Sequence, residues 1–182
     1  MSSKPGTPPS WRQWLVRLGR HLWLDAGDVD RLLGRGWDQR MQQAIAQIEM
    51  HSAAELRLCV EAALPWSWLA RDRSADPDQL VRDRAVSLFG QLRVWDTEHN
   101  SGVLIYVLLA EHAIEIVADR GLREIPSAQW EQVASDLAAG LRAGQQDKAL
   151  LEAMRRCGQL LSALQLPQDQ QGNELPNTPF VP

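Results

Sequence analysis

Five side chains with oxygen ligands lie in or beside turn-rich parts of the sequence, and their chemistry suits a divalent cation. They are Glu55, Asp96, Glu98, Asn100 and Asp119. Carboxylate and amide oxygens are the ligands that Ca²⁺ and Mg²⁺ prefer in proteins. Arg120 follows Asp119 directly and would suit an anion or an ion pair. The pattern predicts a Ca²⁺ or Mg²⁺ site with a cationic side chain beside it.

A structural alternative for the same residues stays open. Residues 96–100 resemble the start of an EF-hand loop, but glycine falls at the seventh position instead of the sixth, and Val107 replaces the bidentate glutamate. In the alternative, this stretch shapes a turn before a buried strand, and Asp119 pairs with Arg120 or with a backbone N–H. Because Asp and Asn are common turn residues, spacing alone favours the turn role.

The remaining motifs and the composition narrow the function further. The four histidines lack HxH or HExxH spacing, which argues against zinc. No GxGxxG, P-loop or GxSxG motif is present, so no organic cofactor is expected. The 182 residues carry a formal net charge of −4, which argues against nucleic-acid binding. The longest apolar run, residues 103–110, is far shorter than the ~20 residues that cross a bilayer.

Length and composition indicate one soluble domain. The chain is 45% hydrophobic and 23% charged, which is ordinary for a globular protein. Without a recognisable signal peptide, the protein is expected in the cytoplasm, with Cys59 and Cys157 as thiols. Residues 1–10 and 167–182 are rich in proline and polar residues and are predicted to be disordered, leaving 11–166 as the domain.

Hydrophobic periodicity predicts the elements that must position the site. Apolar stripes at helical spacing predict helices over 11–22, 28–33, 37–51, 77–92, 127–141 and 150–164. Ser10, Asp76 and Ser127 are the predicted caps. Alternation predicts a half-buried strand over 55–62, a continuous apolar run predicts a central strand over 103–110, and a third strand follows over 113–119. Residues 66–76 are predicted to be a loop.

The order of these elements predicts an α/β fold, a three-layer α/β/α sandwich around a small mixed sheet. The first two strands, joined through a helix, should be parallel, and the second and third should form an antiparallel hairpin. The N- and C-terminal helices should pack on the sheet. In that topology Glu55, the loop 96–102 and the turn 119–121 converge at one end of the sheet.

Tryptophans at two places allow two interpretations each. The segment Trp11–Trp23 combines an apolar stripe with arginines, and it either docks on its own domain, which we favour, or makes weak peripheral contact with an anionic membrane. Trp66 and Trp68 form either an exposed contact patch or part of the core rim.

Several blocks of the sequence resemble the TPM-domain family, named for a thylakoid lumen protein, a photosystem II repair protein and a receptor modulator. The strongest marks are Asn100–Gly102 running into the strand Val103–Tyr106, the Asp119–Arg120–Gly121 turn, and Trp130 early in the next helix. Glu55 in HSAAELRLCVEAAL fits the first strand of the short soluble bacterial branch. The resemblance extends from Trp11 to Pro167 and implies a compact α/β/α sandwich.

The resemblance implies two candidate functions, because members are described as calcium-binding proteins, assembly or repair factors, or acid phosphatases. The first is a divalent-cation-binding module that acts on a protein partner, which the sequence does not identify. The second is a metal-assisted phosphomonoesterase. In it Asp96 or Asp119 either attacks the phosphoryl group or activates a water molecule, and Arg120 stabilises the charge. LREIPSAQW replaces the glycine-rich turn and later aspartate that often follow the third strand in this family, which weighs against the phosphatase. A third interpretation is a fold with a decayed site.

Overall fold

The computed structural model describes residues 11–70, 76–164, 166 and 173–182. Its helices are α1 (Trp11–Trp23), α2 (Ala26–Leu33), α3 (Trp37–Glu49), α4 (Trp66–Leu69), α5 (Pro77–Gln91), α6 (Ser127–Arg142) and α7 (Gln146–Ser162). Its strands are β1 (Leu56–Glu61), β2 (Val103–Leu108) and β3 (Ala113–Ala118), with short 3₁₀ turns η1 (Leu109–Glu111) and η2 (Arg120–Leu122). The predicted helices and strands are present, with their ends shifted by a few residues.

Two local predictions were wrong. Residues 66–69 form the single helical turn α4 instead of a loop, and residues 71–75 lie outside the described part. Ser127 does not cap α6, because helical backbone begins at this residue and the extended Pro126, with ψ 140°, occupies the cap position. Asp76 caps α5 as expected, accepting a hydrogen bond from the Asp78 N–H. Ser10 lies outside the described residues.

The sheet has the predicted topology. Its order is β1-β2-β3, with β1 and β2 parallel and β2 and β3 antiparallel. Leu56 pairs with Val103, and Val103 pairs with Ala118 on its other side. The register therefore brings the starts of β1 and β2 and the end of β3 to one end of the sheet.

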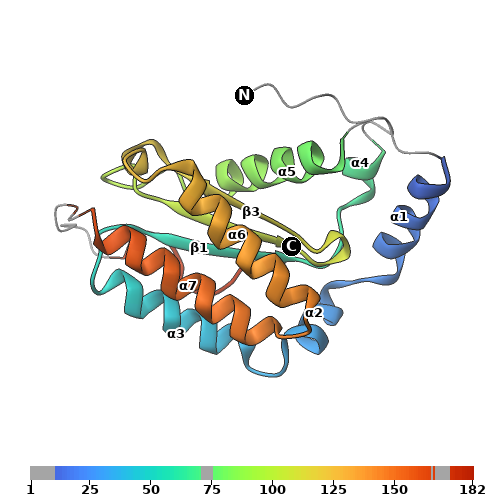
Figure 1. Ribbon diagram of the computed structural model, residues 1–182, viewed down its shortest axis with the longest axis horizontal. Coiled ribbons are helices and arrows are strands. Elements are labelled where there is room, and N and C mark those ends of the chain that lie inside the picture. Colours follow the sequence, from blue (N-terminus) through green and yellow to red (C-terminus); the bar gives the residue numbers. More distant parts are fainter. Residues whose placement is uncertain (1–10, 71–75, 165, 167–172) are drawn as a thin grey trace.

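Helices cover both faces of this sheet, which makes the predicted three-layer α/β/α sandwich (Figure 1). Leu58 and Ile105 belong to the core cluster shared with α3, α6 and α7. Leu104 and Tyr106 point the other way, into the cluster shared with α5. Successive side chains of a strand point to opposite faces of the sheet, so the strands separate two apolar cores, one on each face.

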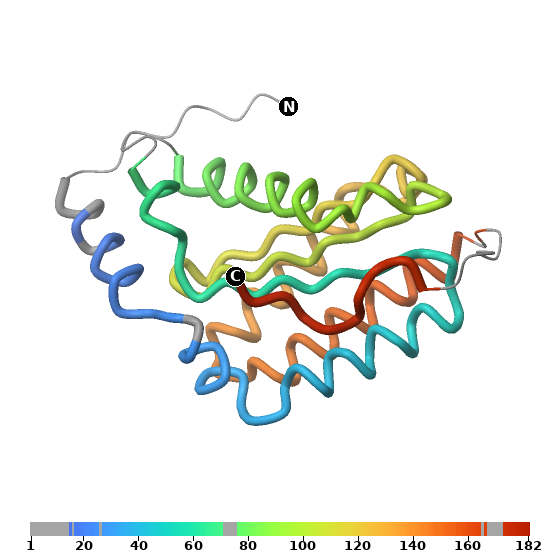
Figure 2. Tube along the Cα trace, turned by 180° about the vertical axis from the view of Figure 1, so that it is seen from behind, coloured from blue at the N-terminus to red at the C-terminus, as the bar shows by residue number. Residues whose placement is uncertain are grey.

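Residues 173–182 lie against β1, although the sequence predicts disorder over 167–182 (Figure 2). Phe180 forms a parallel bridge with Cys59, donating its N–H to the Leu58 carbonyl and accepting from the Val60 N–H, both at 2.9 Å. Leu175 is buried. This cover, together with α5, explains why every residue of β1 is buried when alternation predicts a half-buried strand.

Among the side chains of α1 that the structure describes, Leu18 packs against the core cluster under α5, a polar cluster adds further contacts, and other apolar side chains stay exposed. His21 is buried, accepts the Leu64 N–H at Nδ1 (2.9 Å) and contacts Glu111 through Nε2 (2.7 Å). Leu22 and Trp23 are 71% and 88% exposed. Docking is therefore partial, and the membrane contact stays a prediction. Among the described residues, no helix has the length and apolarity needed to cross a bilayer.

Candidate functional site

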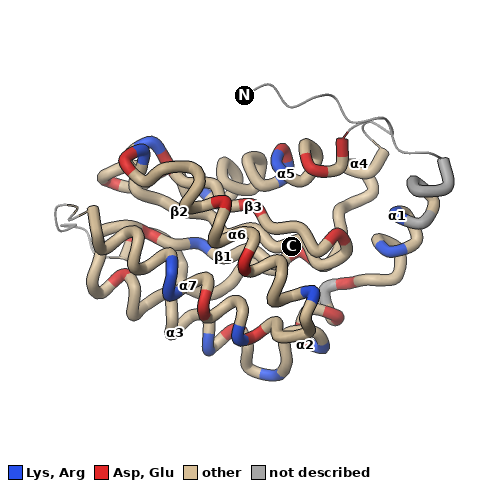
Figure 3. Tube along the Cα trace, in the orientation of Figure 1, with Lys and Arg blue, Asp and Glu red and all other residues tan. Residues whose placement is uncertain are grey.

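The three predicted segments meet at one end of the sheet through their backbones. The Val103 N–H donates to the Glu55 carbonyl (2.8 Å). The Asp119 N–H donates to the Gly102 carbonyl, and the Gly121 N–H to the Asn100 carbonyl, both at 2.9 Å. The loop 96–102 and the turn 119–121 are thus held side by side, and Figure 3 shows acidic and basic residues close together in these turns.

Glycine is what permits this close approach. A Cβ at position 121 would lie 2.3 Å from the His99 carbonyl oxygen and 2.6 Å from that of Asn100. Real Cβ atoms do not come so near to backbone oxygens. The sequence Asp119–Arg120–Gly121 therefore fixes the distance between the two segments, in addition to supplying polar side chains.

The carboxylate of Glu55 faces residues 173–182. It is 5% exposed and accepts hydrogen bonds from the backbone N–H groups of Glu174 (3.2 Å) and Leu175 (3.0 Å). On the neighbouring loop, the Glu98 N–H donates to the Glu174 carboxylate at 2.9 Å. Asp96 is exposed, with Arg93 4.0 Å away. In the described ranges no group of three or more His, Cys, Asp or Glu residues is arranged to hold a metal ion.

Asp119, Asn100 and Arg120 form the centre of the rim. Asp119 Oδ1 accepts the Arg120 N–H at 2.7 Å and so caps η2, as the turn interpretation expects. The Arg120 guanidinium donates to Asn100 Oδ1 at 2.9 and 2.6 Å, and Asn100 has a left-handed φ of 51°. Asp119 Oδ2 and His99 Nε2 are buried, and neither has a hydrogen-bond partner within the described residues.

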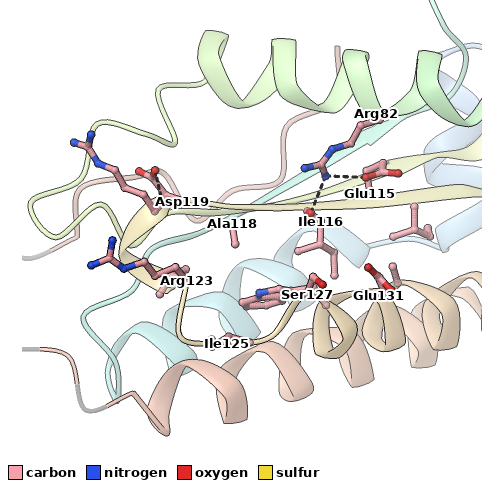
Figure 4. Close-up of a pocket in the computed structure, with 14 residues that line it drawn as sticks. Arg82, Glu115, Ile116, Ala118, Asp119, Arg123, Ile125, Ser127 and Glu131 are labelled. Carbon is pink, nitrogen blue, oxygen red and sulfur yellow. Dashed lines mark hydrogen bonds and ion pairs between the residues drawn. The ribbon is translucent and has the colours of Figure 1, made fainter. Parts of the chain in front are cut away.

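A groove of about 700 Å³ begins at Asp119 and runs between β3 and α6 (Figure 4). Its floor is apolar and includes Ile116 and Trp130. Charged side chains of both signs line it, namely Arg82, Arg120, Arg123, Glu115, Asp119 and Glu131. Arg82 is engaged with the Glu115 carboxylate (2.9 Å) and the Ile116 carbonyl (3.2 Å). Arg123 lies at the Asp119 end of the groove (Figure 4).

Sequence reasoning missed Glu49, which lines a second pocket of about 540 Å³ beside the start of β1. Its Oε1 accepts the Leu56 N–H at 3.1 Å, while its Oε2 is buried without a well-formed hydrogen bond. Burial, with a smaller contribution from the Glu55 charge, raises the pKa of Glu49 to about 8. Its position in the sequence could have identified it, because Glu49 follows Ile45 by four residues and so lies on the apolar stripe of α3.

Glu49 makes stability fall as pH rises. A carboxyl whose pKa is raised in the folded state keeps a proton that the unfolded chain loses. The contribution of Glu49 to the free energy of unfolding is therefore full below pH 4.5 and is lost as the pH rises to about 8. Replacing Glu49 with glutamine is therefore expected to stabilise the protein at pH 9 and to change little at pH 4.5. Urea unfolding midpoints at the two pH values measure this. The exposed Glu124→Gln serves as the control, and equal effects at both pH values would contradict the prediction.

The fold and the rim place the protein among small α/β/α domains with an acidic turn cluster at one end of a mixed sheet. A family model described as the TPM domain and labelled TPM_phosphatase matches residues 28–160, so the chain belongs to the TPM-domain family, as the resemblance indicates. A solved structure, the NMR structure of the BA42 protein from the psychrophilic bacterium Bizionia argentinensis, matches with a TM-score of 0.66. It is 23% identical, and the match covers 82% of this chain and 95% of that one, which supports the fold. No curated protein gave a match.

Proposed function

We propose that this protein is a divalent-cation-binding module, in which the rim of residues 96–102 and 119–121 holds Ca²⁺ or Mg²⁺. The observation that carries the proposal is Asp119 Oδ2, a buried carboxylate oxygen with no donor in the described part of the chain. Leaving such an atom unpaired costs about 1–3 kcal/mol, which a bound cation would recover.

The ligand set that fits is narrower than the sequence indicates. Asp119 and Asn100 present oxygens at the centre of the rim, and Asp96 and Glu98 belong to the adjoining loop. Glu55 is the least suited, because both of its oxygens accept backbone N–H groups. Arg120 would have to leave Asn100 Oδ1 when a cation binds, so the ion and the guanidinium compete for the same atom.

A protein partner suits the surface beside the rim. Trp95 directly precedes the acidic loop and is 51% exposed. Exposed tryptophans are favoured as anchors in protein interfaces. Release of Arg120 from Asn100 by the cation would free a cationic group at the rim, so the ion would change the charge that this surface presents to a partner.

Cation binding is tested by calorimetry and thermal unfolding with Ca²⁺ and Mg²⁺. The wild-type protein should bind one ion and gain roughly 2.7 kcal/mol of stability at a hundred times Kd. Asp119→Asn should weaken binding at least about tenfold, since the charge is lost while the cap on Arg120 can remain. Asp136→Asn, on the exposed face of α6, is the matched control. No heat and an unchanged Tm at millimolar metal would overturn the proposal.

A phosphomonoesterase is the second candidate, because the groove beside Asp119 carries Arg120 and Arg123, and guanidinium groups bind phosphate oxygens well. A bound cation would polarise the phosphoryl oxygen. Asp119 or Asp96 would either activate a water molecule to attack the phosphorus or attack it directly, giving an acyl phosphate that water then hydrolyses. In both cases the alcohol of the ester leaves, and Arg120 would stabilise the developing charge. Hydrolysis of a chromogenic phosphate ester should then fall at least about a hundredfold in Asp119→Asn or Asp96→Asn. Full activity in both variants would exclude this candidate.

A further inference from the structure

The outer edge of β1 is covered by the chain's own residues 173–182, here called the strap. β1 is the first strand of the sheet order, so its outward N–H and C=O groups would otherwise be unpaired. Phe180 satisfies two of them, through the Leu58 carbonyl and the Val60 N–H. Figure 2 shows the strap following β1 along its outer side. The arrangement is that of a peptide added to a sheet edge.

Two charged side chains clamp the backbone of the strap. Glu55 accepts the N–H groups of Glu174 and Leu175. Arg57, itself buried, donates from Nη1 to the carbonyls of Pro176 and Thr178, the latter at 2.7 Å. On the side of the strap these contacts involve only backbone groups, so Glu55 and Arg57 would hold an extended segment of many different sequences.

Selectivity would come from apolar side chains of the strap, of which Val181 packs against the core cluster on the α3 side of the sheet and two others pack on the α5 side. Leu175 is buried and Phe180 is partly buried, and both pack against the core cluster that contains Cys59 and Tyr106. They are five residues apart and lie on either side of the Arg57 contacts. An occupant must therefore be extended, present free backbone groups between its anchors, and carry one apolar side chain near each end.

We propose that the edge of β1 is a peptide-docking site whose resident occupant is the strap. Its external ligand is an extended segment of a partner protein with the Leu-x-x-x-x-Phe spacing, running parallel to β1 and held by Glu55 and Arg57. The proposal does not depend on the cation, although the strap touches the rim loop through the Glu98 N–H and the Glu174 carboxylate.

Competition between the strap and an added peptide tests the proposal in the full-length chain. A tethered ligand acts at an effective concentration of about millimolar, so the wild-type protein should bind a labelled peptide of residues 173–182 (NELPNTPFVP) only weakly. Leu175→Ala with Phe180→Ala weakens the resident strap and leaves the edge intact. This variant should bind the peptide at least about tenfold more tightly than the wild type.

Two further variants locate the binding. Arg57→Leu in the background of the two strap substitutions should lower the peptide affinity at least about tenfold, because two clamped carbonyls lose their donor. Val86→Ala, at an exposed position on α5, should leave the affinity of the wild-type chain unchanged. A scrambled peptide should not bind. Equal peptide affinity in the wild type and the double strap variant would overturn the proposal.

Amide hydrogen exchange in the wild-type protein measures release of the strap directly. The Val60 N–H is bonded to the strap, whereas the Ile105 N–H lies within β2 at the centre of the sheet. Release of the strap should let Val60 exchange at least about tenfold faster than Ile105 in the wild-type protein, through local opening. Exchange of both amides only on global unfolding, or failure of the double strap variant to fold, would show that the strap is part of the core and would overturn the proposal.

Discussion

Replacing Arg84 with methionine is expected to lower the free energy of unfolding by about 3–5 kcal/mol, because it leaves a buried carboxylate without its counter-charge. Glu61, at the end of β1, is 2% exposed. It accepts from Arg84 Nε at 3.0 Å and Nη2 at 2.5 Å, and from the Tyr106 hydroxyl at 2.6 Å. The Trp68 ring lies over the guanidinium at 5.3 Å. Burial, reinforced by the charge of Glu61, raises the pKa of Tyr106, so its hydroxyl stays a donor.

Matched variants separate the ion pair from simple packing. Glu61→Leu combined with Arg84→Met removes both charges and should recover most of the loss, whereas Tyr106→Phe should cost only about 1 kcal/mol. Urea unfolding followed by circular dichroism at pH 7 measures all three proteins. A loss below about 1 kcal/mol in Arg84→Met would contradict the prediction, because it would place Glu61 in contact with water.

Replacing Gly102 with alanine should be comparably severe, with a loss of about 3 kcal/mol or more. The new Cβ would lie 1.9 Å from the Val94 carbonyl oxygen and 2.9 Å from its carbonyl carbon, and these backbone atoms cannot turn aside as the end of a flexible side chain could. Gly102 also carries the carbonyl that accepts the Asp119 N–H, so the rim should be displaced together with the start of β2.

Gly90→Ala is the matched control for this substitution. Gly90 lies inside α5, and a Cβ added there would meet no atom of another segment within 4 Å. Alanine at this position should stabilise the protein by up to about 1 kcal/mol through helix propensity. Thermal unfolding of both variants checks the pair. Similar Tm values for the two variants would show that the loop before β2 yields easily.

The topology was predictable from the sequence because the strands differ in pattern. The continuous apolar run at 103–110 identifies a strand buried on both faces, and the alternation at 55–62 and 113–119 identifies its two neighbours. Connection rules then give the parallel pair and the hairpin, which the register confirms. The convergence of the three rim segments follows from the topology alone.

The pairing of side chains could not be predicted in the same way. Glu55 contacts Glu174 and Leu175, which lie more than a hundred positions later in the sequence. At that separation local patterns carry no information. The strap was missed because its prolines and polar residues are also typical of disorder, and only the unpaired edge of β1 gives Leu175 and Phe180 somewhere to pack. Alternation places Glu61 on the solvent-facing side of its strand, whereas the structure buries it against Arg84. Arg84 lies on α5, so no local pattern around Glu61 indicates this partner.

The late position of the strap also affects how the protein is made. Chains emerge from the ribosome N-terminus first, so β1, β2 and β3 are all synthesised before the residues that cover the outer side of β1. During that interval β1 is an open strand edge, the kind of surface that recruits other nascent chains or chaperones. Slowing translation between α7 and residue 173 should therefore increase aggregation of the newborn chain, even though the strap covers this edge in the finished protein.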